Sequence, residues 1–307
     1  MNPNERLSGL TPFVYAARSG SFAAAAVQLN LTPSAVGKSV ARMEQRLGTR
    51  LFERTTRHLS LTDAGQAYFE TCLRVLNDLT DAQAVLASHA LTPMGRLRID
   101  LPASFGRLVV MPLLIAFSQR HPYLRPHITF TDRFVDLLEE GVDVAVRIGT
   151  VNTLPPAIGF RYLGTERLIF CAAPAYLARR GEPARVDQLE EHDCVVYGKN
   201  DGAVSPWSVT TPAGRHEPLA VTHRMVVGDS EAQVAALEAG AGIAQMATWL
   251  VKDSLQAGRL EHILTEQVAD GLPLHLVWPT SRRLTPKIDL LLQTLGRTAL
   301  HPLTSPA

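Results

Sequence analysis

The stretch from residue 19 to residue 57 constrains this chain most, because it encodes two short helices with almost nothing between them. Ser21 can cap a first helix, since its hydroxyl can accept a hydrogen bond from an N–H group of the first turn. The four alanines at 23–26 favour that helix and keep its surface small enough for a second helix to cross it closely. Asn30 stands where the helix must stop, because asparagine tolerates the left-handed conformation of a turn.

A second helix follows at once. Thr32 can cap it, Pro33 suits its first position, and Gly48 ends it. Apolar residues at helical spacing predict one buried face, made of Ala35, Val36, Val40, Met43 and Leu47. The opposite face is small, polar and partly basic, with Ser34, Gly37, Lys38, Ala41, Arg42 and Gln45. Such a face fits the major groove of DNA, although two ordinary helices of an all-α domain would show a similar pattern.

Charge favours a nucleic-acid partner for this part of the chain. Residues 1–62 contain eight Lys and Arg but three acids, a net charge of +5, whereas residues 63–307 contain 22 basic and 26 acidic residues. Basic and hydroxyl side chains cluster in one short loop, with Arg50, Arg54, Thr55, Thr56, Arg57 and His58. A basic loop after two such helices is typical of a wing on the phosphate backbone, and a merely solvated basic face explains the cluster less well.

The same residues resemble the N-terminal domain of LysR-type transcriptional regulators. The segment LGTRLFERTTRHLSLTDAG, residues 47–65, is close to a signature of that family. The resemblance is carried by Phe13, Ala16, Gly20, Ser21, Phe22, Ala25, Ala26, Leu29, Thr32, Pro33, Ser34, Ala35, Val36, Lys38, Glu44, Leu47, Gly48, Leu51, Phe52, Arg54, Leu61, Thr62 and Gly65. It continues through the C-terminal body and covers essentially the whole chain.

The resemblance implies which residues contact DNA. The second helix would enter the major groove, and the wing would lie on the backbone or in the minor groove. The candidate DNA-binding residues are Ser21, Thr32, Pro33, Ser34, Gly37, Lys38, Arg42, Arg54, Thr55, Thr56 and Arg57. Position 37 departs from the family, which usually has a hydroxyl residue there. Gly37 therefore loses a contact or lets the backbone approach the DNA more closely.

Residues 63–89 are predicted to form one long helix, capped by Thr62 and favoured at its start by Asp63. Apolar residues recur along it at alternating spacings of four and three, at Tyr68, Cys72, Val75, Leu79, Ala82 and Leu86. This spacing predicts a seam for a second copy of the helix, and the length favours pairing over a helix packed on its own domain. The resemblance agrees, because this helix dimerises the DNA-binding domains of the family, whose recognition helices then address two half-sites.

From residue 95 the pattern changes to alternating strands and helices. The predicted strands are 97–101, 128–130, 142–148, 168–172, 195–197, 243–246 and 274–278. The predicted helices are 103–120, irregular near Pro112, and 134–140, 175–180, 231–239 and 287–300. This order is typical of a parallel α/β sheet, and its two successive sets resemble the bilobed type 2 periplasmic-binding-protein body that the family has.

The predicted fold class is therefore α+β multidomain. It combines a winged helix-turn-helix at 1–62, a linker and dimerisation helix at 63–89, a hinge at 90–94 and a bilobed effector-binding domain at 95–307. One subdomain takes about 95–163 and 270–307, and the other takes about 164–269.

A bilobed α/β body places its ligand between the lobes, beyond the carboxyl ends of the strands. The candidate effector-binding residues are Ala103, Ser104, Phe105, Thr131, Arg133, Phe134, Arg147, Ile148 and Gly149, with Met246 on the opposite wall. Ser104 lies at a helix N-terminus, where N–H groups favour a carboxylate. Arg133 follows the predicted strand at 128–130, and Arg147 lies at the end of the predicted strand at 142–148. We expect a small organic acid, aromatic or not; a satisfied loop residue or a surface arginine is the alternative at each position.

The sequence shows no pattern for catalysis or for a metal. Cys72, Cys171 and Cys194 are widely spaced, and the ten histidines form no HxxxH pair. There is no G-x-S-x-G and no P-loop, and the glycines at 240–242 follow a predicted helix rather than a strand. We therefore expect no enzyme activity, no cofactor and no metal. We expect Cys72 to be buried on the helix seam, with redox sensing as the lesser alternative.

A ligand-binding protein with the same body and no role on DNA is the main alternative. Such a protein normally carries an export signal, which residues 1–20 lack, and no later run is apolar enough to span a membrane. We expect a cytoplasmic protein without membrane contact. Its expected partners are double-stranded promoter DNA, a small-molecule effector and copies of itself, as a dimer or tetramer, with RNA polymerase as a further candidate.

Overall fold

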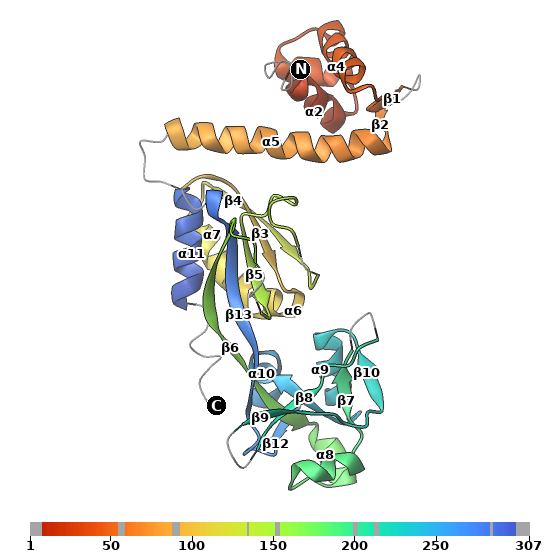
Figure 1. The fold of residues 1–307 in the computed structure, drawn as a ribbon, viewed down its shortest axis with the longest axis vertical. Helices are drawn as coiled ribbons and strands as arrows, with labels where there is room; N and C mark the ends of the chain where they lie inside the picture. Colours follow the sequence, from red (N-terminus) through yellow and green to blue (C-terminus); the bar gives the residue numbers. More distant parts are fainter. Residues whose placement is uncertain are drawn as a thin grey trace. The chain divides into compact units, whose positions relative to one another are not determined.

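The computed structural model describes residues 8–54, 59–87, 93–133, 135–150, 154–198, 202–211, 215–282 and 285–298. The chain divides into two compact units, one up to residue 90 and one from residue 91 (Figure 1). Each unit has its own buried core.

The N-terminal unit consists of three short helices, a two-stranded wing and a long helix. The short helices are α2 (Leu10–Ser19), α3 (Phe22–Leu29) and α4 (Pro33–Leu47). The wing pairs β1 (Phe52–Arg54) antiparallel with β2 (Leu59–Leu61), and the long helix is α5 (Asp63–Ala87). Helices α3 and α4 with the wing form the predicted winged helix-turn-helix (Figure 1).

The predicted capping residues set the helix boundaries. The Ser21 hydroxyl accepts hydrogen bonds from two N–H groups in the first turn of α3, and the Thr32 hydroxyl accepts one from Ala35 at 3.2 Å. Asn30 and Gly48 follow the two helices in the left-handed conformation, with φ of 54° and 67°. These local contacts confirm the predicted turn between α3 and α4.

The buried face of α4 is narrower than the sequence predicts. Val36, Val40 and Met43 are fully buried, and Leu47 is half-buried. Ala35, expected on the same face, is exposed, because it lies in the first turn of the helix, beyond the residues that α2 and α3 cover. The core of this unit therefore begins one turn into α4.

Two sets of contacts hold the start of the wing, one to α4 and one to α5. Glu44 Oε1 accepts hydrogen bonds from the N–H groups of Leu51 and Phe52 at 2.9 and 3.1 Å. The Thr62 hydroxyl accepts one from the Gly65 N–H at 2.9 Å and so caps α5, as predicted. Gly65 packs against the wing so closely that a Cβ there would lie 2.0 Å from the Leu51 carbonyl oxygen. Position 65 therefore requires glycine.

The first half of α5 packs on its own unit. Cys72 is 2% exposed within the core, the Tyr68 ring lies 5.6 Å from that of Phe13, and Val75 is half-buried against the same cluster. The prediction that Cys72 lies in a dimer interface is wrong, because contact with the helix's own unit generates the same spacing of four and three.

The second half of α5 keeps one predicted seam residue on the surface. Leu79 is 45% exposed. The side chains of Ala82 and Leu86 fall outside the described residues, as does most of the predicted hinge at 90–94. Among the predicted seam residues whose side chains the structure describes, Leu79 is thus the exposed one, and pairing with a second copy remains a prediction.

The C-terminal unit begins with a parallel sheet. Strand β3 (Gly95–Leu101) pairs parallel with β4 (Leu124–Phe130) and with β5 (Val144–Ile148). Between β3 and β4 run α6 (Ala103–Phe105), the π-helical segment η1 (Gly106–Val110) and α7 (Met111–Arg120). The irregularity expected near Pro112 takes the form of this π-helical segment just before it.

The helix predicted at 134–140 is wrong. Residue 134 lies outside the described residues, and residues 137–141 form turns. The Asp136 carboxylate accepts hydrogen bonds from the N–H groups of Leu138 and Glu139, and Gly141 follows with φ of 67°. The Asp136 side chain satisfies the first N–H groups, and the left-handed Gly141 follows five residues later, so there is room for one turn only.

Two long strands cross from one half of this unit to the other. Strands β6 (Ile158–Ala172) and β13 (Ala269–Pro279) pair antiparallel along most of their length (Figure 1). The sheet order is β11-β6-β13-β5-β3-β4, with β12 also on β6. We call β3 to β5, α6, η1, α7 and α11 (Pro286–Thr298) lobe I, and the elements from α8 to β12 lobe II.

Lobe II contains more short elements than the sequence predicts. Those expected are α8 (Pro174–Arg180), β7 (Val195–Tyr197), α9 (Ser230–Glu238) and β11 (Ile243–Ala247). Those missed are η2 (Val186–Glu191), β8 (Trp207–Thr210), β9 (His216–Leu219), β10 (Met225–Val227), α10 (Thr248–Gln256) and β12 (Glu261–Ile263), and η3 (Thr280–Arg282) follows β13. The missed strands are too short to show an alternating pattern.

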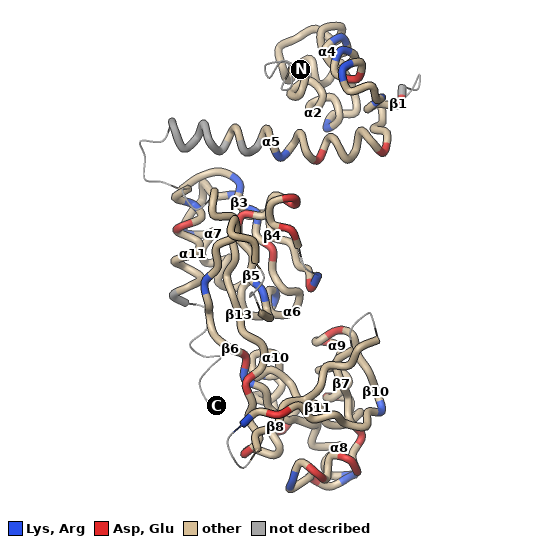
Figure 2. Tube along the Cα trace, in the orientation of Figure 1, with Lys and Arg blue, Asp and Glu red and all other residues tan. Residues whose placement is uncertain are grey.

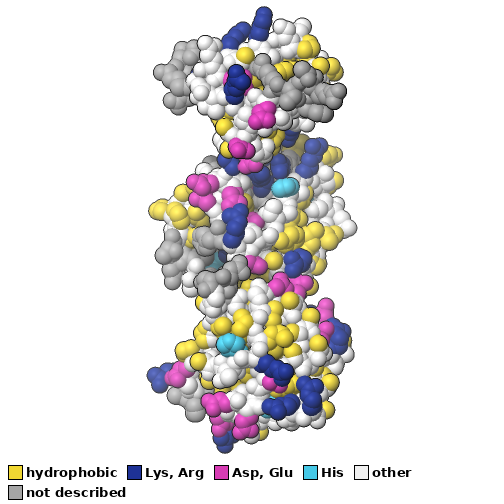
Figure 3. All heavy atoms as spheres, turned by 90° about the vertical axis from the view of Figure 1, so that its right-hand side faces the viewer, with side chains coloured by type: hydrophobic (Ala, Val, Ile, Leu, Met, Phe, Trp, Pro, Cys, Tyr) yellow, Lys and Arg dark blue, Asp and Glu magenta, His cyan; other side chains and the backbone are white. Residues whose placement is uncertain are grey.

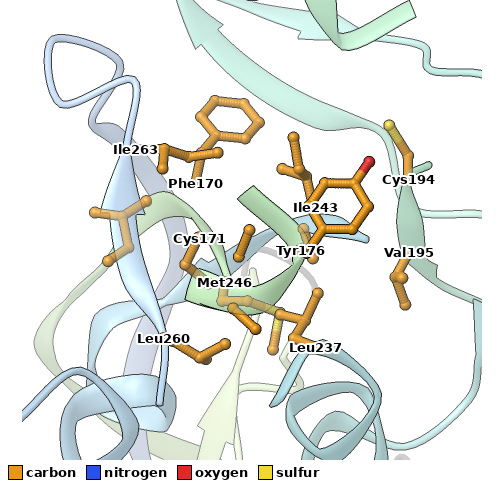
Figure 4. Packing of buried hydrophobic residues seen from close by; sticks show 14 of the residues in the cluster. Phe170, Cys171, Tyr176, Cys194, Val195, Leu237, Ile243, Met246, Leu260 and Ile263 are labelled. Carbon is orange, nitrogen blue, oxygen red and sulfur yellow. The ribbon is translucent and has the colours of Figure 1, made fainter. Parts of the chain in front are cut away.

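The core of lobe II buries two of the three thiols. Phe170, Tyr176 and Ile243 are fully buried together with Cys171 and Cys194 (Figure 4). Burial raises the pKa of the Cys171 thiol to about 12, and burial with the nearby Asp193 carboxylate raises that of Cys194 to about 11. Both groups therefore stay as unreactive thiols at neutral pH.

A buried carboxylate joins the lobes where the long strands cross. Glu166 of β6 is 7% exposed; its Oε1 accepts a hydrogen bond from Trp249 Nε1 at 2.9 Å, and its Oε2 accepts one from the Leu272 N–H at 3.2 Å. The Trp249 ring of lobe II in turn meets Phe105 of lobe I edge to face, with ring centroids 5.1 Å apart. Burial raises the pKa of Glu166, although both hydrogen bonds oppose that shift.

Gly65 and Gly37 offer a matched pair of helical glycines for a stability test. We expect Gly65→Ala to lower the free energy of unfolding of the N-terminal unit by about 1–3 kcal/mol, because the added Cβ forces the Leu51 backbone to move. At Gly37 the nearest neighbouring atom is 4.0 Å from an added Cβ, so alanine fits there. Because alanine favours a helix more than glycine does, Gly37→Ala should raise the free energy of unfolding by about 1 kcal/mol. All tryptophans lie in the C-terminal unit, so amide hydrogen exchange is the measurement. Equal exchange in the two variants would contradict the packing described.

Glu166 predicts a pH dependence of stability. Its pKa is higher in the folded protein than in the unfolded chain, so between these two values the folded state binds more protons and the free energy of unfolding falls as pH rises. Glu166→Gln removes this term. The free energy of unfolding of Glu166→Gln, relative to that of the native protein, should therefore rise as pH rises from about 4.3 towards neutrality. Urea denaturation followed through tryptophan fluorescence measures it. If the free energies of unfolding of the two proteins change with pH in parallel, Glu166 is not the source of the pH dependence. Glu182→Gln, at an exposed position, is the control.

Candidate nucleic-acid interface and effector site

The outer face of α4 presents the polar residues predicted for it. The exposed side chains are Ser34, Lys38, Ala41, Arg42 and Gln45. Figure 2 shows basic residues along α4, and Figure 3 shows Lys and Arg on the surface of the N-terminal unit. Because Val36, Val40 and Met43 anchor the opposite face, this polar surface is held rigidly. It has the size and chemistry that a major groove accepts.

The helix caps lie next to this surface. Thr32 and Pro33 are exposed at the start of α4, and Ser21 is half-buried at the start of α3. The hydroxyls of Ser21 and Thr32 accept from backbone N–H groups, which leaves each O–H free to donate to a phosphate. Gly37 is half-buried on this face, and a Cβ added there would lie 4.0 Å from the Phe22 ring.

The structure describes the two strands of the wing but not the loop between them. Its strands pair in the register Phe52↔Leu61 and Arg54↔Leu59, so the backbone of Arg54 ends the first strand. The Arg54 side chain, and the residues Thr55, Thr56 and Arg57, lie outside the described residues. Their contacts with DNA remain predictions.

Ser104 is the best placed of the predicted effector residues. It follows β3, is 6% exposed, and its hydroxyl makes no hydrogen bond to another described residue. The adjacent Ala103 N–H, expected to receive a ligand, instead donates to the Asp132 carboxylate at 2.9 Å. The Thr131 hydroxyl accepts from the Arg133 N–H at 3.2 Å. The chain itself therefore caps this helix N-terminus, and Ser104 remains as a donor beside it.

Arg147 is held inside the sheet by a carboxylate. Its Nη1 donates to Asp100 Oδ1 at 2.8 Å, and these side chains are 12% and 3% exposed. The Thr129 hydroxyl donates to the other Asp100 oxygen at 2.6 Å. The Arg147 Nη2 is buried with no hydrogen-bond partner. Arg147 thus neutralises Asp100 and keeps one donor that a ligand could satisfy.

Arg133 is paired as well. Its two terminal nitrogens donate to the two Glu140 oxygens at 2.7 and 2.8 Å on the surface of lobe I. The hydrogen bonds and charge of Arg133 lower the pKa of Glu140, against a smaller opposing effect of burial. The expectation of free arginines at the carboxyl ends of the strands is therefore not met, because both already bind carboxylates of the chain.

Two predicted effector residues belong to cores instead. Phe105 is 1% exposed and packs against Trp249, and Met246 is 3% exposed within the lobe II cluster (Figure 4). Both predictions are wrong, because an apolar side chain at the end of a strand or start of a helix is drawn into the adjacent core.

The remaining predicted effector residues have mixed outcomes. Ile148 is half-buried against the lobe I core. Gly149 adopts φ of 119° and donates its N–H to the Pro273 oxygen at 2.8 Å. Phe134 lies outside the described residues.

One ion pair that links the lobes was not predicted from the sequence. Arg107 of η1 binds Glu231 in the first turn of α9, with Nε 3.2 Å from Glu231 Oε1. Helical spacing could have drawn attention to Arg107, one turn beyond Ser104. Its partner lies 124 residues away, and no local pattern connects the two.

The described segments contain neither a membrane-spanning helix nor a cluster of metal ligands. No helix there has the length and apolar character that crossing a membrane requires. Within the same part of the chain, no group of three or more His, Cys, Asp or Glu is arranged to hold a metal ion.

Two family models match the chain. The model described as a bacterial regulatory helix-turn-helix protein, lysR family, matches residues 7–66, and the model described as the LysR substrate binding domain matches residues 91–299. The first match favours a DNA-binding regulator over the alternative of a ligand-binding protein without a DNA role.

Relatives along nearly the whole chain are named as transcriptional regulators. The HTH-type transcriptional regulator CrgA of Neisseria meningitidis serogroup C (strain 8013) is 32% identical over 293 residues, 94% of this chain and 96% of that protein. The regulator DmlR of Escherichia coli (strain K12) is 34% identical over 271 residues, 87% of this chain and 86% of that protein. The solved structure of CrgA, a LysR-type transcriptional regulator from Neisseria meningitidis, is 30% identical, with a TM-score of 0.60 over 96% of this chain and 98% of that chain. This chain therefore belongs to the LysR family of transcriptional regulators, with an N-terminal helix-turn-helix that binds DNA and a C-terminal effector-binding domain.

Proposed function

We propose that this protein binds specific promoter DNA in the cytoplasm through the polar face of α4, and that a small organic acid in its C-terminal unit changes that binding. The exposed, partly basic face of α4, in a segment with a net charge of +5, carries the DNA part of the proposal. Lys38 and Arg42 are its cations, and Ser34, Thr32 and Pro33 lie at its leading end.

We further propose the division of labour along the chain. Residues 1–62 bind DNA, residues 63–89 join two copies, residues 90–94 are the hinge, and residues 95–307 bind the effector. Leu79, exposed on α5, supports pairing through the second half of that helix, and two such copies present two recognition helices to two half-sites. Pairing of dimers into tetramers, contact with RNA polymerase and the absence of enzyme activity complete the proposal.

Substitution of Lys38 and Arg54 tests the docking on DNA. We expect Lys38→Ala and Arg54→Ala each to weaken binding to the DNA upstream of the protein's own gene, by about 1–3 kcal/mol where the side chain contacts a base. Gel-shift titration at two salt concentrations is the measurement. A loss confined to certain sequences indicates base contact, whereas a uniform loss with a shallower salt slope indicates phosphate contact.

The exposed Lys252 of α10 supplies the control for charge alone. Lys252→Ala removes the same charge from the C-terminal unit and should leave the titration unchanged. Undiminished binding by the Lys38→Ala, Arg54→Ala double variant would refute the proposed docking.

Ser104 carries the effector part of the proposal. Its nearly buried hydroxyl makes no hydrogen bond to another residue that the structure describes, and the buried Arg147 Nη2 is a second such donor in the same lobe. A carboxylate accepts hydrogen bonds from both kinds of donor. Phe105 and Met246 are no longer part of the proposed site.

Calorimetric titration with a panel of aliphatic and aromatic carboxylates tests the effector class. We expect at least one to bind, and Ser104→Ala to weaken that binding about tenfold or more, since a hydrogen bond to a charged group contributes about 1.5–3 kcal/mol. If no carboxylate in the panel binds the folded protein, the effector is not an organic acid of this kind.

A further inference from the structure

An ion pair joins lobe I to lobe II close to Ser104. Arg107 lies in the π-helical segment η1, one turn beyond Ser104, and Glu231 lies in the first turn of α9. The Arg107 Nε donates to Glu231 Oε1 at 3.2 Å, and the Arg107 Nη2 contacts the same oxygen. The second Glu231 oxygen is not used by this pair. We call it the Arg107–Glu231 latch.

The latch differs from the two ion pairs of lobe I described above. Arg147–Asp100 and Arg133–Glu140 each lie within lobe I, so a ligand that disturbed either would not change how the lobes are joined. The latch crosses between the lobes, and its side chains are 44% and 40% exposed. An exposed ion pair favours the joined state of its two residues by about fivefold at most. A competing carboxylate can therefore replace Glu231 on Arg107.

Acidic residues from both lobes lie around the latch ends. Burial raises the pKa of Tyr197 in lobe II, and the Asp132 and Asp229 carboxylates raise it further. Asp132 follows β4 of lobe I, and Asp229 caps α9 two residues before Glu231. Carboxylates of the two lobes therefore act on the same hydroxyl group.

A second contact remains when the latch opens. Phe105, two residues before Arg107, packs edge to face on Trp249, and Trp249 donates to the buried Glu166. Phe105 and Glu166 are buried and Trp249 is half-buried, and the strands β6 and β13 run beside them with main-chain hydrogen bonds. Loss of the latch thus frees the α9 end of lobe II while the Trp249 contact keeps the lobes together.

We propose that Arg107 is an anion-recognising residue of the effector site, and that Glu231 occupies its guanidinium until the carboxylate of an effector takes its place. The exchange substitutes one carboxylate for another and releases α9 from lobe I. Ser104, one turn away, donates to the incoming carboxylate. This inference rests on the proposed effector site and adds to it both a charged contact and a route to a change in the lobes.

The first experiment tests the latch without a ligand. Arg107→Gln and Glu231→Gln in the full chain should speed amide hydrogen exchange in both segments, 103–111 and 229–238. The charge-reversed double variant, Arg107→Glu with Glu231→Arg, should restore slow exchange in both. Arg185→Gln breaks an exposed ion pair within lobe II and should leave both segments unchanged. If both segments exchange at the native rate in the two single variants, the ion pair does not hold the lobes together and the proposal is wrong.

The second experiment tests the exchange of carboxylates, with benzoate as the probe and benzamide as its uncharged counterpart. Calorimetry should show benzoate binding about fivefold tighter to Glu231→Gln than to the native protein, and lost in Arg107→Gln. Benzamide should not distinguish the native protein from Glu231→Gln. Benzoate affinities that are equal in all three proteins, or absent from all three, would overturn the role of Arg107.

The outcomes separate this inference from the proposed function. If Ser104→Ala abolishes benzoate binding while Arg107→Gln retains it, the effector site stands and the latch falls. Promoter binding is measured independently by gel shift, so its failure would bear on the DNA part of the proposal alone.

Discussion

The pairing of β6 with β13 is the constraint on which the C-terminal unit depends. Both strands contribute to both lobes, so the lobes cannot separate without breaking a ladder of main-chain hydrogen bonds. The ladder is interrupted by register shifts between Asp270 and Pro273 and between Leu274 and His275. Such register shifts increase the local twist of the two strands. Two lobes joined by a continuous ladder can still rotate relative to each other through a change in this twist. Side-chain contacts between the lobes then select among the twists that the ladder permits.

Internal carboxylates govern how this unit can meet an anion. Asp132 caps the helix after β3, Asp100 holds Arg147, and Glu140 holds Arg133. Each positive group is thus stable in the absence of a ligand, because the chain supplies the counter-charge. A ligand anion gains only the difference between its own contact and the one that it replaces. The Arg107–Glu231 latch is exposed and spans the two lobes, so we expect it to couple binding most directly to the arrangement of the lobes.

Local chemistry made the helix-turn-helix predictable, whereas long-range packing decided the effector site. Caps at Ser21 and Thr32 act within three residues, so the sequence alone placed α3 and α4 correctly. The seam through Cys72 was misassigned, since a helix packed on its own domain shows the same period as one packed on a partner. The partners of Arg133 and Arg147 depend on strand register and on a turn, which composition and spacing do not reveal. Phe105 entered a core for the same reason.

The burial of all three cysteines has a practical consequence. Cys72, Cys171 and Cys194 are each enclosed by apolar neighbours, and burial raises the pKa of each thiol. The native cysteines should therefore react slowly with maleimides, since the thiolate is the reactive form. A single cysteine introduced on α9 and another on α7 would carry spin labels or fluorophores without prior removal of native thiols. Distances between such labels would report the twist of the two lobes in solution, on DNA and in the presence of small molecules.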